Sequence, residues 1–275
     1  MKHFANLVMA LLIVGLLGVA QAQQPAVAPQ GRPQPKLKTQ DELKAYQEAT
    51  AKTSPGELEL AALEFSLKFP DSEIRNLLFL NAMRAYENAN NPEKVVEMGR
   101  KTLEIYPNEP DALVTIANTL ASRTRETDLD KDERLADAVK NAQKALTVID
   151  TDLLVPPTIT PEQVQGIKNV MKSMAYAALG TVEMAKKNYP GAEQQFQMAA
   201  NINTAQPDAV VWLRLAVSRE QQKKYPEALE AANQAVKFAP AGSQAATLAA
   251  SQRDRLQKLA TGGSASPAPN APTQQ

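Results

Sequence analysis

Cysteine is absent from this 275-residue sequence, and its only histidine is His3. A chain without thiols forms no disulfide and carries no cysteine-linked lipid. Because His3 lies within the export signal predicted below, the mature chain is expected to contain no imidazole. It would then have neither a Ser–His nor a Cys–His nucleophile pair, and it would lack the nitrogen and sulfur ligands of common metal sites. We therefore expect a protein without a cofactor or a bound metal.

Net charge is also missing, because 30 Lys and Arg residues balance 30 Asp and Glu residues. Binding to nucleic acid needs clustered Lys and Arg that neutralise phosphates. None of the 11 glycines belongs to a G-x-G-x-x-G or G-x-x-x-x-G-K-[ST] loop, which would hold the phosphates of a nucleotide. We therefore expect no nucleic-acid partner.

The first residues have the pattern of an export signal. Lys2 precedes an apolar run from Phe4 to Ala20, and Ala20 and Ala22 are small residues where signal peptidase requires them. As a helix this run would rise only ~26 Å, which is short of a ~30 Å hydrocarbon core. We expect 1–22 to be a signal peptide cleaved after Ala22, without membrane insertion after cleavage, so that the protein is periplasmic or secreted. The alternative is an N-terminal membrane anchor.

Two further segments are too poor in apolar residues to build a core. Residues 23–39 are rich in Pro and Gln, and residues 262–275 are rich in Gly, Pro, Ser and Ala. Such compositions cannot offset the entropy lost on ordering. We expect a flexible linker over 23–39 and a disordered tail over 261–275.

The region between these segments has the periodicity of helices. Apolar residues recur at helical spacing in stretches separated by short breaks at Pro, Asn and Gly, and no strand pattern occurs. Two stretches repeat 36 residues apart. Tyr189-Pro-Gly-Ala192 is followed by Phe196 and Ala199, and Tyr225-Pro-Glu-Ala228 is followed by Ala232 and Ala235. A period in the thirties is typical of stacked helical hairpins.

This repeat resembles the tetratricopeptide repeat (TPR), a helix–turn–helix unit of about 34 residues. Its early W-x2-L-small motif matches Trp212, Leu215 and Ala216, and its later small and proline positions match Ala228, Ala235 and Pro240. The resemblance implies an all-α, right-handed superhelical solenoid of about five hairpins plus a C-terminal capping helix. The expected solenoid covers 40–260, with repeats at 39–72, 76–109, 110–152, 173–206 and 209–242 and the capping helix at 243–260. We expect a charged insertion of about Arg125–Leu135 to split the third hairpin.

In this family the first helices of the hairpins line a concave surface that binds peptides. Carried over by their place in the repeat, the residues that the resemblance assigns to this groove are Arg84, Glu87, Asn88, Asn118, Ser122, Thr181, Met184, Val217, Glu220 and Gln221. The Lys, Arg and Asn set with which some members clamp a C-terminal carboxylate is not reproduced at these positions.

One segment of the insertion invites a metal-binding interpretation. Asp128, Asp130 and Asp132 alternate as in a calcium loop, but Glu133 stands where that loop needs Gly and Val139 where it needs Glu. We favour a solvated insertion over a calcium site.

We therefore interpret the chain as a non-catalytic scaffold, monomeric, that binds a protein or peptide partner in the concave groove. One alternative is a membrane-associated accessory factor of envelope assembly. The remote alternative is a carboxylate-based glycan hydrolase, because paired acids are the one catalytic set that the composition leaves.

Overall fold

The computed structural model describes residues 31–261, so the predicted signal peptide, residues 23–30 and the predicted tail from 262 onward lie outside the described part. Within 31–261 the chain forms eleven α-helices and no β-strand. Their bounds are α1 Gln40–Thr50, α2 Pro55–Lys68, α3 Arg75–Asn88, α4 Pro92–Ile105, α5 Pro110–Arg123, α6 Lys131–Asp152, α7 Pro161–Ala185, α8 Tyr189–Ile202, α9 Ala209–Gln221, α10 Tyr225–Phe238 and α11 Gln244–Ala260.

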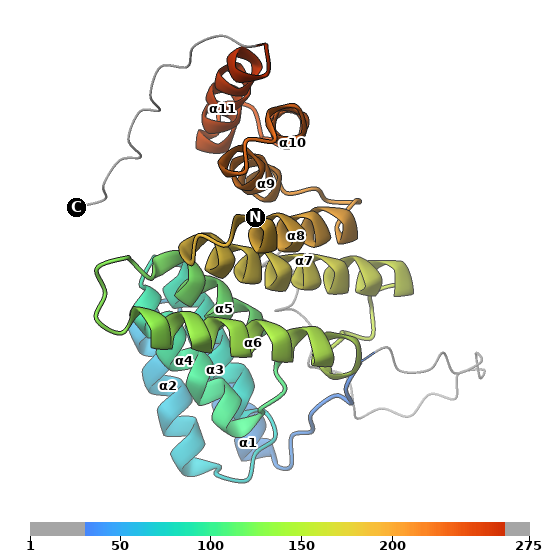
Figure 1. Ribbon diagram of the computed structural model, residues 1–275. Helices are drawn as coiled ribbons and strands as arrows, with labels where there is room; N and C mark the ends of the chain where they lie inside the picture. Colours follow the sequence, from blue (N-terminus) through green and yellow to red (C-terminus); the bar gives the residue numbers. More distant parts are fainter. Residues whose placement is uncertain (1–30, 262–275) are drawn as a thin grey trace.

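The helices stack in chain order. Each helix packs against the next, and α5 also packs broadly against α7. The stack rises in Figure 1 from α1–α6 at the bottom, through α7 and α8, to α9–α11 at the top. The predicted all-α fold of five hairpins with a closing helix is confirmed, with α11 covering α9 and α10.

Helix starts follow the local sequence signals. The side chain of Thr39 accepts a hydrogen bond from the Glu42 N–H at the start of α1. At the start of α7 the Thr160 side chain accepts a hydrogen bond from the Gln163 N–H. The Gln163 side chain in turn accepts one from the Thr160 N–H, which completes a capping box. These side chains satisfy backbone N–H groups that have no partner within the helix. The proline that opens α7 has no backbone N–H and so needs no such partner.

Three hairpin turns share one backbone conformation. Asn90, Lys187 and Lys223 follow the first helices α3, α7 and α9, and their φ angles are 54°, 60° and 61°. In each turn the next N–H donates to a carbonyl five residues earlier, as when Asn91 donates to Tyr86 at 3.0 Å. This is the Schellman ending of a helix, which glycine usually adopts because a Cβ destabilises the left-handed conformation. Two of the three positions are lysines.

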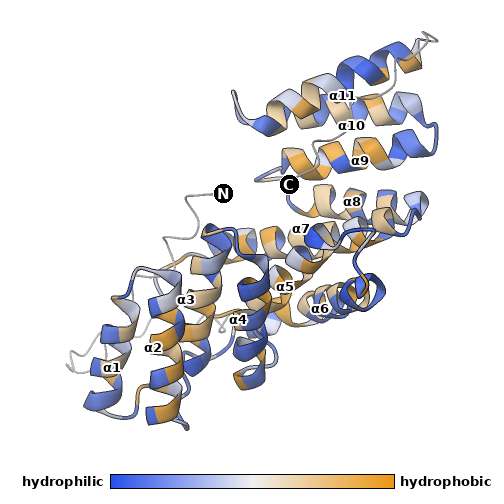
Figure 2. Ribbon diagram, turned by 90° about the vertical axis from the view of Figure 1, so that its left-hand side faces the viewer, coloured by the Kyte–Doolittle hydropathy of each residue, from blue (hydrophilic) through white to orange (hydrophobic). Residues whose placement is uncertain are grey.

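Small residues let the paired helices approach closely. Gly99 of α4 lies against Ile116 and Met83, and Gly180 of α7 lies against the ring of Phe196 in α8. Alanines at 0% exposure dominate the cluster between α8 and α11. Figure 2 shows apolar stretches on the sides of α2, α3, α5 and α9 that meet their neighbours. Close packing of short side chains is what allows hairpins of this kind to stack.

The middle of the stack departs from a regular repeat. The insertion forms a turn over 124–130, in which Leu129 is fully exposed, and its remaining residues extend the start of α6, which is 22 residues long. The next helix, α7, runs unbroken for 25 residues. Val164 and Met171 on its added N-terminal part are buried against α5 and α6, and Leu153 from the preceding loop joins them.

The chain before α1 differs from the expected flexible linker. Residues 31–38 run extended along the loops that join the first hairpins, and the Arg32 N–H donates to the Leu153 carbonyl at 3.1 Å. The buried side chain of Arg32 contacts Glu109 and Tyr106 and so helps to order this segment, which its Pro- and Gln-rich composition does not reveal.

Candidate functional site

The predicted groove residues lie on the first helices α3, α5, α7 and α9, and we call the surface formed by these ten positions the first-helix face. Two of them join neighbouring first helices. Arg84 of α3 forms an ion pair with Asp111 of α5, to which its Nε donates at 3.0 Å. The side-chain amide of Asn118 in α5 donates to the Met174 carbonyl of α7 at 3.2 Å. These side chains hold the stack together.

Two more predicted residues make the same kind of connection. The hydroxyl of Thr181 in α7 accepts a hydrogen bond of 2.8 Å from Arg214 of α9. Glu220 of α9 accepts from Gln252 at 2.6 Å and forms an ion pair with Arg255, both on α11. Glu220 is only 8% exposed. The structure therefore does not support Glu220 as a groove ligand, because both of its carboxylate oxygens are already occupied inside the protein.

The other six residues of the first-helix face remain more accessible. Glu87, Asn88, Ser122 and Gln221 are exposed in the last turns of their helices, and Met184 and Val217 are half-buried. The structure therefore places the accessible polar members of the set near the hairpin turns.

Electrostatics distinguish Arg84 from Arg214, an arginine of α9 that contacts the first-helix face through Thr181. The carboxylate of Asp111 raises the pKa of Arg84 above its usual value, which shows a well-compensated charge. Burial lowers the pKa of Arg214, and the more distant Asp208 opposes this only in part. Within residues 31–261, no carboxylate lies within 4.0 Å of the Arg214 guanidinium, whose single hydrogen bond goes to Thr181. Arg214 was not among the residues predicted from the sequence. The pattern that indicates it is a single arginine one helical turn before the predicted residue Val217, in a helix whose first residues are otherwise apolar.

The three aspartates of the insertion do not converge. Asp128 accepts a hydrogen bond of 2.8 Å from the Arg125 N–H within the turn, and Asp130 lies 3.9 Å from Arg134 in an ion pair. No group of three or more His, Cys, Asp or Glu side chains in the described range is arranged to hold a metal ion. The acids instead stabilise the turn and the start of α6, near whose N-terminus negative charge is favourable.

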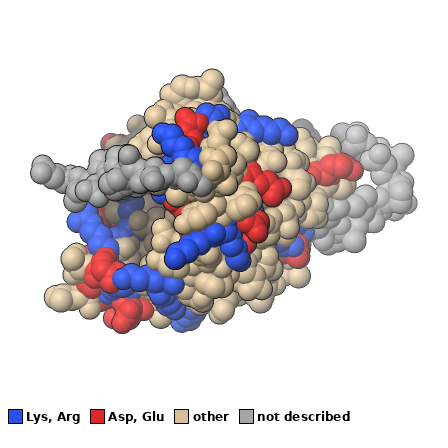
Figure 3. Space-filling view, turned by 45° about the horizontal axis from the view of Figure 1, so that its top comes forward, with Lys and Arg blue, Asp and Glu red and all other residues tan. Residues whose placement is uncertain are grey.

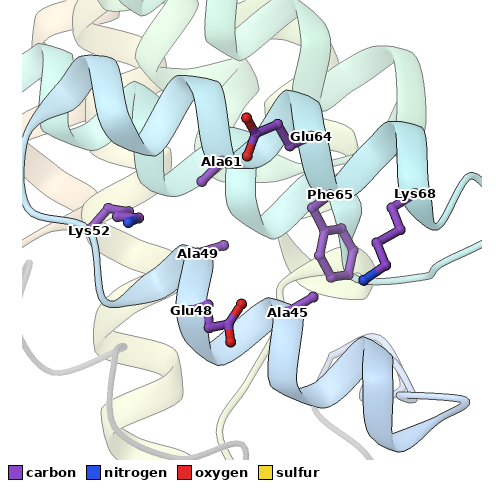
Figure 4. Close-up of a pocket in the computed structure, with 8 residues that line it drawn as sticks. All are labelled: Ala45, Glu48, Ala49, Lys52, Ala61, Glu64, Phe65 and Lys68. Carbon is purple, nitrogen blue, oxygen red and sulfur yellow. The ribbon is translucent and has the colours of Figure 1, made fainter.

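A cavity of about 290 Å³ opens between α1 and α2. Figure 4 shows its apolar floor and charged rim, and its lining residues are Ala45, Glu48, Ala49, Lys52, Ala61, Glu64, Phe65 and Lys68. Both glutamates are exposed. Paired carboxylates act on glycosidic bonds when one of them is held protonated in a water-restricted site. The open rim of this cavity does not offer such a setting.

Charges of both signs are mixed elsewhere on the surface. In Figure 3, basic and acidic side chains alternate over the face that is shown.

Comparison with known proteins gives distant similarity at the level of structure. A thermophilic TPR protein of Thermus thermophilus is 14% identical, with a TM-score of 0.48 over 77% of this chain and 98% of that chain. PilW, described as a widely conserved type IV pilus biogenesis factor, is 16% identical, with a TM-score of 0.37 over 76% of this chain and 98% of that one. No protein-family model and no curated protein matches the sequence.

The fold assignment rests on the chain's own features. Consecutive helices pair into hairpins, the hairpins stack in order, and Gly180 and Ala216 occupy the close-approach positions that the repeat reserves for small residues. The described chain is thus an all-α solenoid of stacked helical hairpins, which resemble tetratricopeptide repeats in their small residues.

Proposed function

We propose that this chain is a non-catalytic scaffold that binds a protein segment on the first-helix face between α7 and α9. The observation that carries the proposal is the uncompensated charge of Arg214. Arg214 is partly buried. A guanidinium stays protonated in proteins, so even partial burial without a carboxylate partner costs free energy. A ligand that supplies the carboxylate recovers this cost on binding.

The surroundings of Arg214 indicate the rest of the ligand. Val210 and Val217 lie one helical turn before and after Arg214 on α9, and both are partly accessible, Val210 at 36%. Residues at i−4 and i+3 share one side of a helix. The matching ligand is a segment with an acidic side chain or a C-terminal carboxylate flanked by apolar side chains.

The proposed place of action is the exported space, the periplasm or the exterior of the cell. It rests on the export-signal pattern of residues 1–22, which lie outside the described part of the chain. Among the described residues, none of the helices combines the length and the hydropathy needed to cross a membrane. The mass of the protein recovered from the cell envelope tests cleavage after Ala22.

Site-specific crosslinking tests the binding site. A photoreactive residue at Val210 should capture a partner from cell-envelope extract, and one at Glu230, exposed on α10, should not. The captured partner is then purified and its affinity measured by titration. Replacing Arg214 with Met keeps an unbranched apolar stem and removes the charged guanidinium, and it should weaken binding by at least about tenfold, since a hydrogen bond to a charged group contributes ~1.5–3 kcal/mol.

Arg100→Met is the matched control, because Arg100 lies exposed on the second helix α4, away from the first-helix face. Equal capture from the two photoreactive positions, or equal affinity of the Arg214→Met and Arg100→Met chains, contradicts the proposal.

A further inference from the structure

The loops that join successive hairpins lie along one edge of the stack. Residues 31–38, which we call the strap, cross this edge in an extended conformation. The Arg32 N–H donates to Leu153 in the α6–α7 loop, the Lys36 N–H donates to Glu73 at 3.0 Å, and the Lys38 ammonium donates to the Asp71 carbonyl at 2.7 Å. The strap thus connects loops that lie far apart in sequence.

Arg32 is inserted into a pocket beneath the strap. Its guanidinium lies 4.1 Å from the centre of the Tyr106 ring and 2.8 Å from the Glu109 carboxylate. The side chains of Arg32 and Glu109 are only 9% and 3% exposed. The amide of Asn76 donates to Glu109 at 3.1 Å, and the Tyr106 hydroxyl donates to Asp152 at 2.7 Å. An aromatic face beside a carboxylate is suited to a guanidinium.

The pocket also selects backbone shape. Arg32 forms an isolated parallel β-bridge with Leu154, so the ligand must be extended where it enters. A Cβ at Gly31 would collide with the Leu153 carbonyl oxygen and approach the Val155 side chain. Pro33 and Pro35 cannot belong to a helix interior and keep the strap extended.

Few side chains of the strap are buried. The side chains of Pro33, Gln34 and Lys36 are exposed, so burial rests mainly on Arg32 and the half-buried Leu37. Neither Nε nor Nη2 of Arg32 makes an aligned hydrogen bond, although the ion pair with Glu109 is close. Burial raises the pKa of Glu109 to about 7 even with Arg32 beside it. Segments with few buried contacts open locally at low cost in free energy.

We propose that the pocket formed by Tyr106, Glu109 and Asn76 is a docking site for an extended, arginine-bearing segment of a partner protein, and that the strap is its intramolecular competitor. Charge complementarity selects the occupant, because Arg32 shows in cis which side chain the Glu109 carboxylate and the Tyr106 ring accept. The site is distinct from the first-helix face, so either can exist without the other.

Binding of a labelled peptide tests the site directly. The probe is a fluorescent peptide with the sequence of residues 31–38. It is added to the full chain and to the full chain that carries both Gly31→Ala and Arg32→Ala, substitutions that should displace the strap from the pocket. A covalently attached competitor acts at an effective concentration of about millimolar. The substituted chain should therefore bind the peptide at least about tenfold more tightly than the unsubstituted chain.

Specificity is read from two controls. A peptide in which Arg32 is replaced by Ala should lose at least about tenfold in affinity for the substituted chain, and Glu109→Gln in that chain should weaken the original peptide similarly. Equal affinity of the two chains, or of the peptides with and without arginine, overturns the proposal.

A second measurement does not depend on how the substituted chain folds. Saturating free peptide should accelerate amide hydrogen exchange at Arg32 and Lys36 in the unsubstituted chain, because both N–H groups are bonded only while the strap is docked. The Thr181 region of α7 should be unaffected. Exchange at Arg32 that stays unchanged at saturating peptide refutes competition for the pocket.

Discussion

Replacing Gly180 with alanine should destabilise the protein through one collision. Gly180 lies in α7, where an added Cβ would stand 2.7 Å from Cε1 and 2.8 Å from Cδ1 of Phe196 in α8. The Phe196 ring is fully buried, so it cannot swing away as the end of a flexible side chain could. The two helices must separate, or the ring must leave its preferred rotamer.

A second glycine in the same helix provides the reference. Nothing lies within 4 Å of a Cβ added at Gly166, which is also part of α7. Alanine improves on glycine by ~1 kcal/mol inside a helix, and this gain applies at both positions. Overpacking a core costs ~1–3 kcal/mol. The difference in unfolding free energy between Gly166→Ala and Gly180→Ala thus isolates the collision and should be ~1–3 kcal/mol.

Urea unfolding followed by far-UV circular dichroism measures this difference as a shift in midpoint at equal slope. Phe196→Leu in the Gly180→Ala background should destabilise by less than it does alone, because the smaller side chain relieves the collision. A Gly180→Ala chain as stable as the Gly166→Ala chain would refute the close approach of α7 and α8 at this point.

Three other predictions concern charge and backbone conformation. Lys187→Gly and Lys223→Gly should each raise the free energy of unfolding by ~0.5–1 kcal/mol, because their φ angles of 60° and 61° favour glycine; a loss in urea midpoint would contradict this. Glu109 binds its proton more tightly in the folded chain, with a pKa of about 7 against an ordinary 4.5, so its contribution to stability is complete below pH 4.5 and is lost as pH rises through 7. The loss should be ~3 kcal/mol, and Glu109→Gln should flatten the profile of stability between pH 5 and 8, a window in which no histidine of the described chain titrates. Arg214→Met should leave the unfolding free energy unchanged or slightly higher, whereas Arg84→Met should lower it by ~1 kcal/mol because Asp111 loses its partner; a larger loss for Arg214→Met would show a carboxylate contact that the structure lacks.

The hairpin stack was predictable because its signals are local. The Tyr-Pro starts of α8 and α10, the capping Thr160 and the small residues Gly180 and Ala216 each constrain a few neighbouring residues, and the same constraints recur at a fixed period. The groove was harder to predict, because the same face both joins hairpins and presents side chains to solvent.

A positional rule separates these two roles. The residue directly after the small position of the first helix is Arg84, Asn118 and Thr181 in successive hairpins, and each contacts the next first helix. In the fifth hairpin this residue is Val217, and Glu220 makes the connection to α11 instead. The repeat frame places a residue on the face, but it does not tell which neighbour the side chain will reach. Long-range contacts such as Arg32 with Glu109 leave no periodic trace at all.

The strap has a consequence for the order in which the chain folds. Gln34 and Val155, which are hydrogen-bonded, are 121 positions apart in sequence. Closing a flexible loop of that length costs ~4 kcal/mol of chain entropy, which no short segment recovers by itself. The hydrogen bonds of Arg32 and Gln34 to the α6–α7 loop therefore form only after α6 has brought that loop to the edge of the stack, whereas the contacts of the strap with Glu73 and Glu109 need only the first five helices. In a chain delivered from its N-terminus onward, complete docking of the strap therefore marks the moment at which the third hairpin is complete.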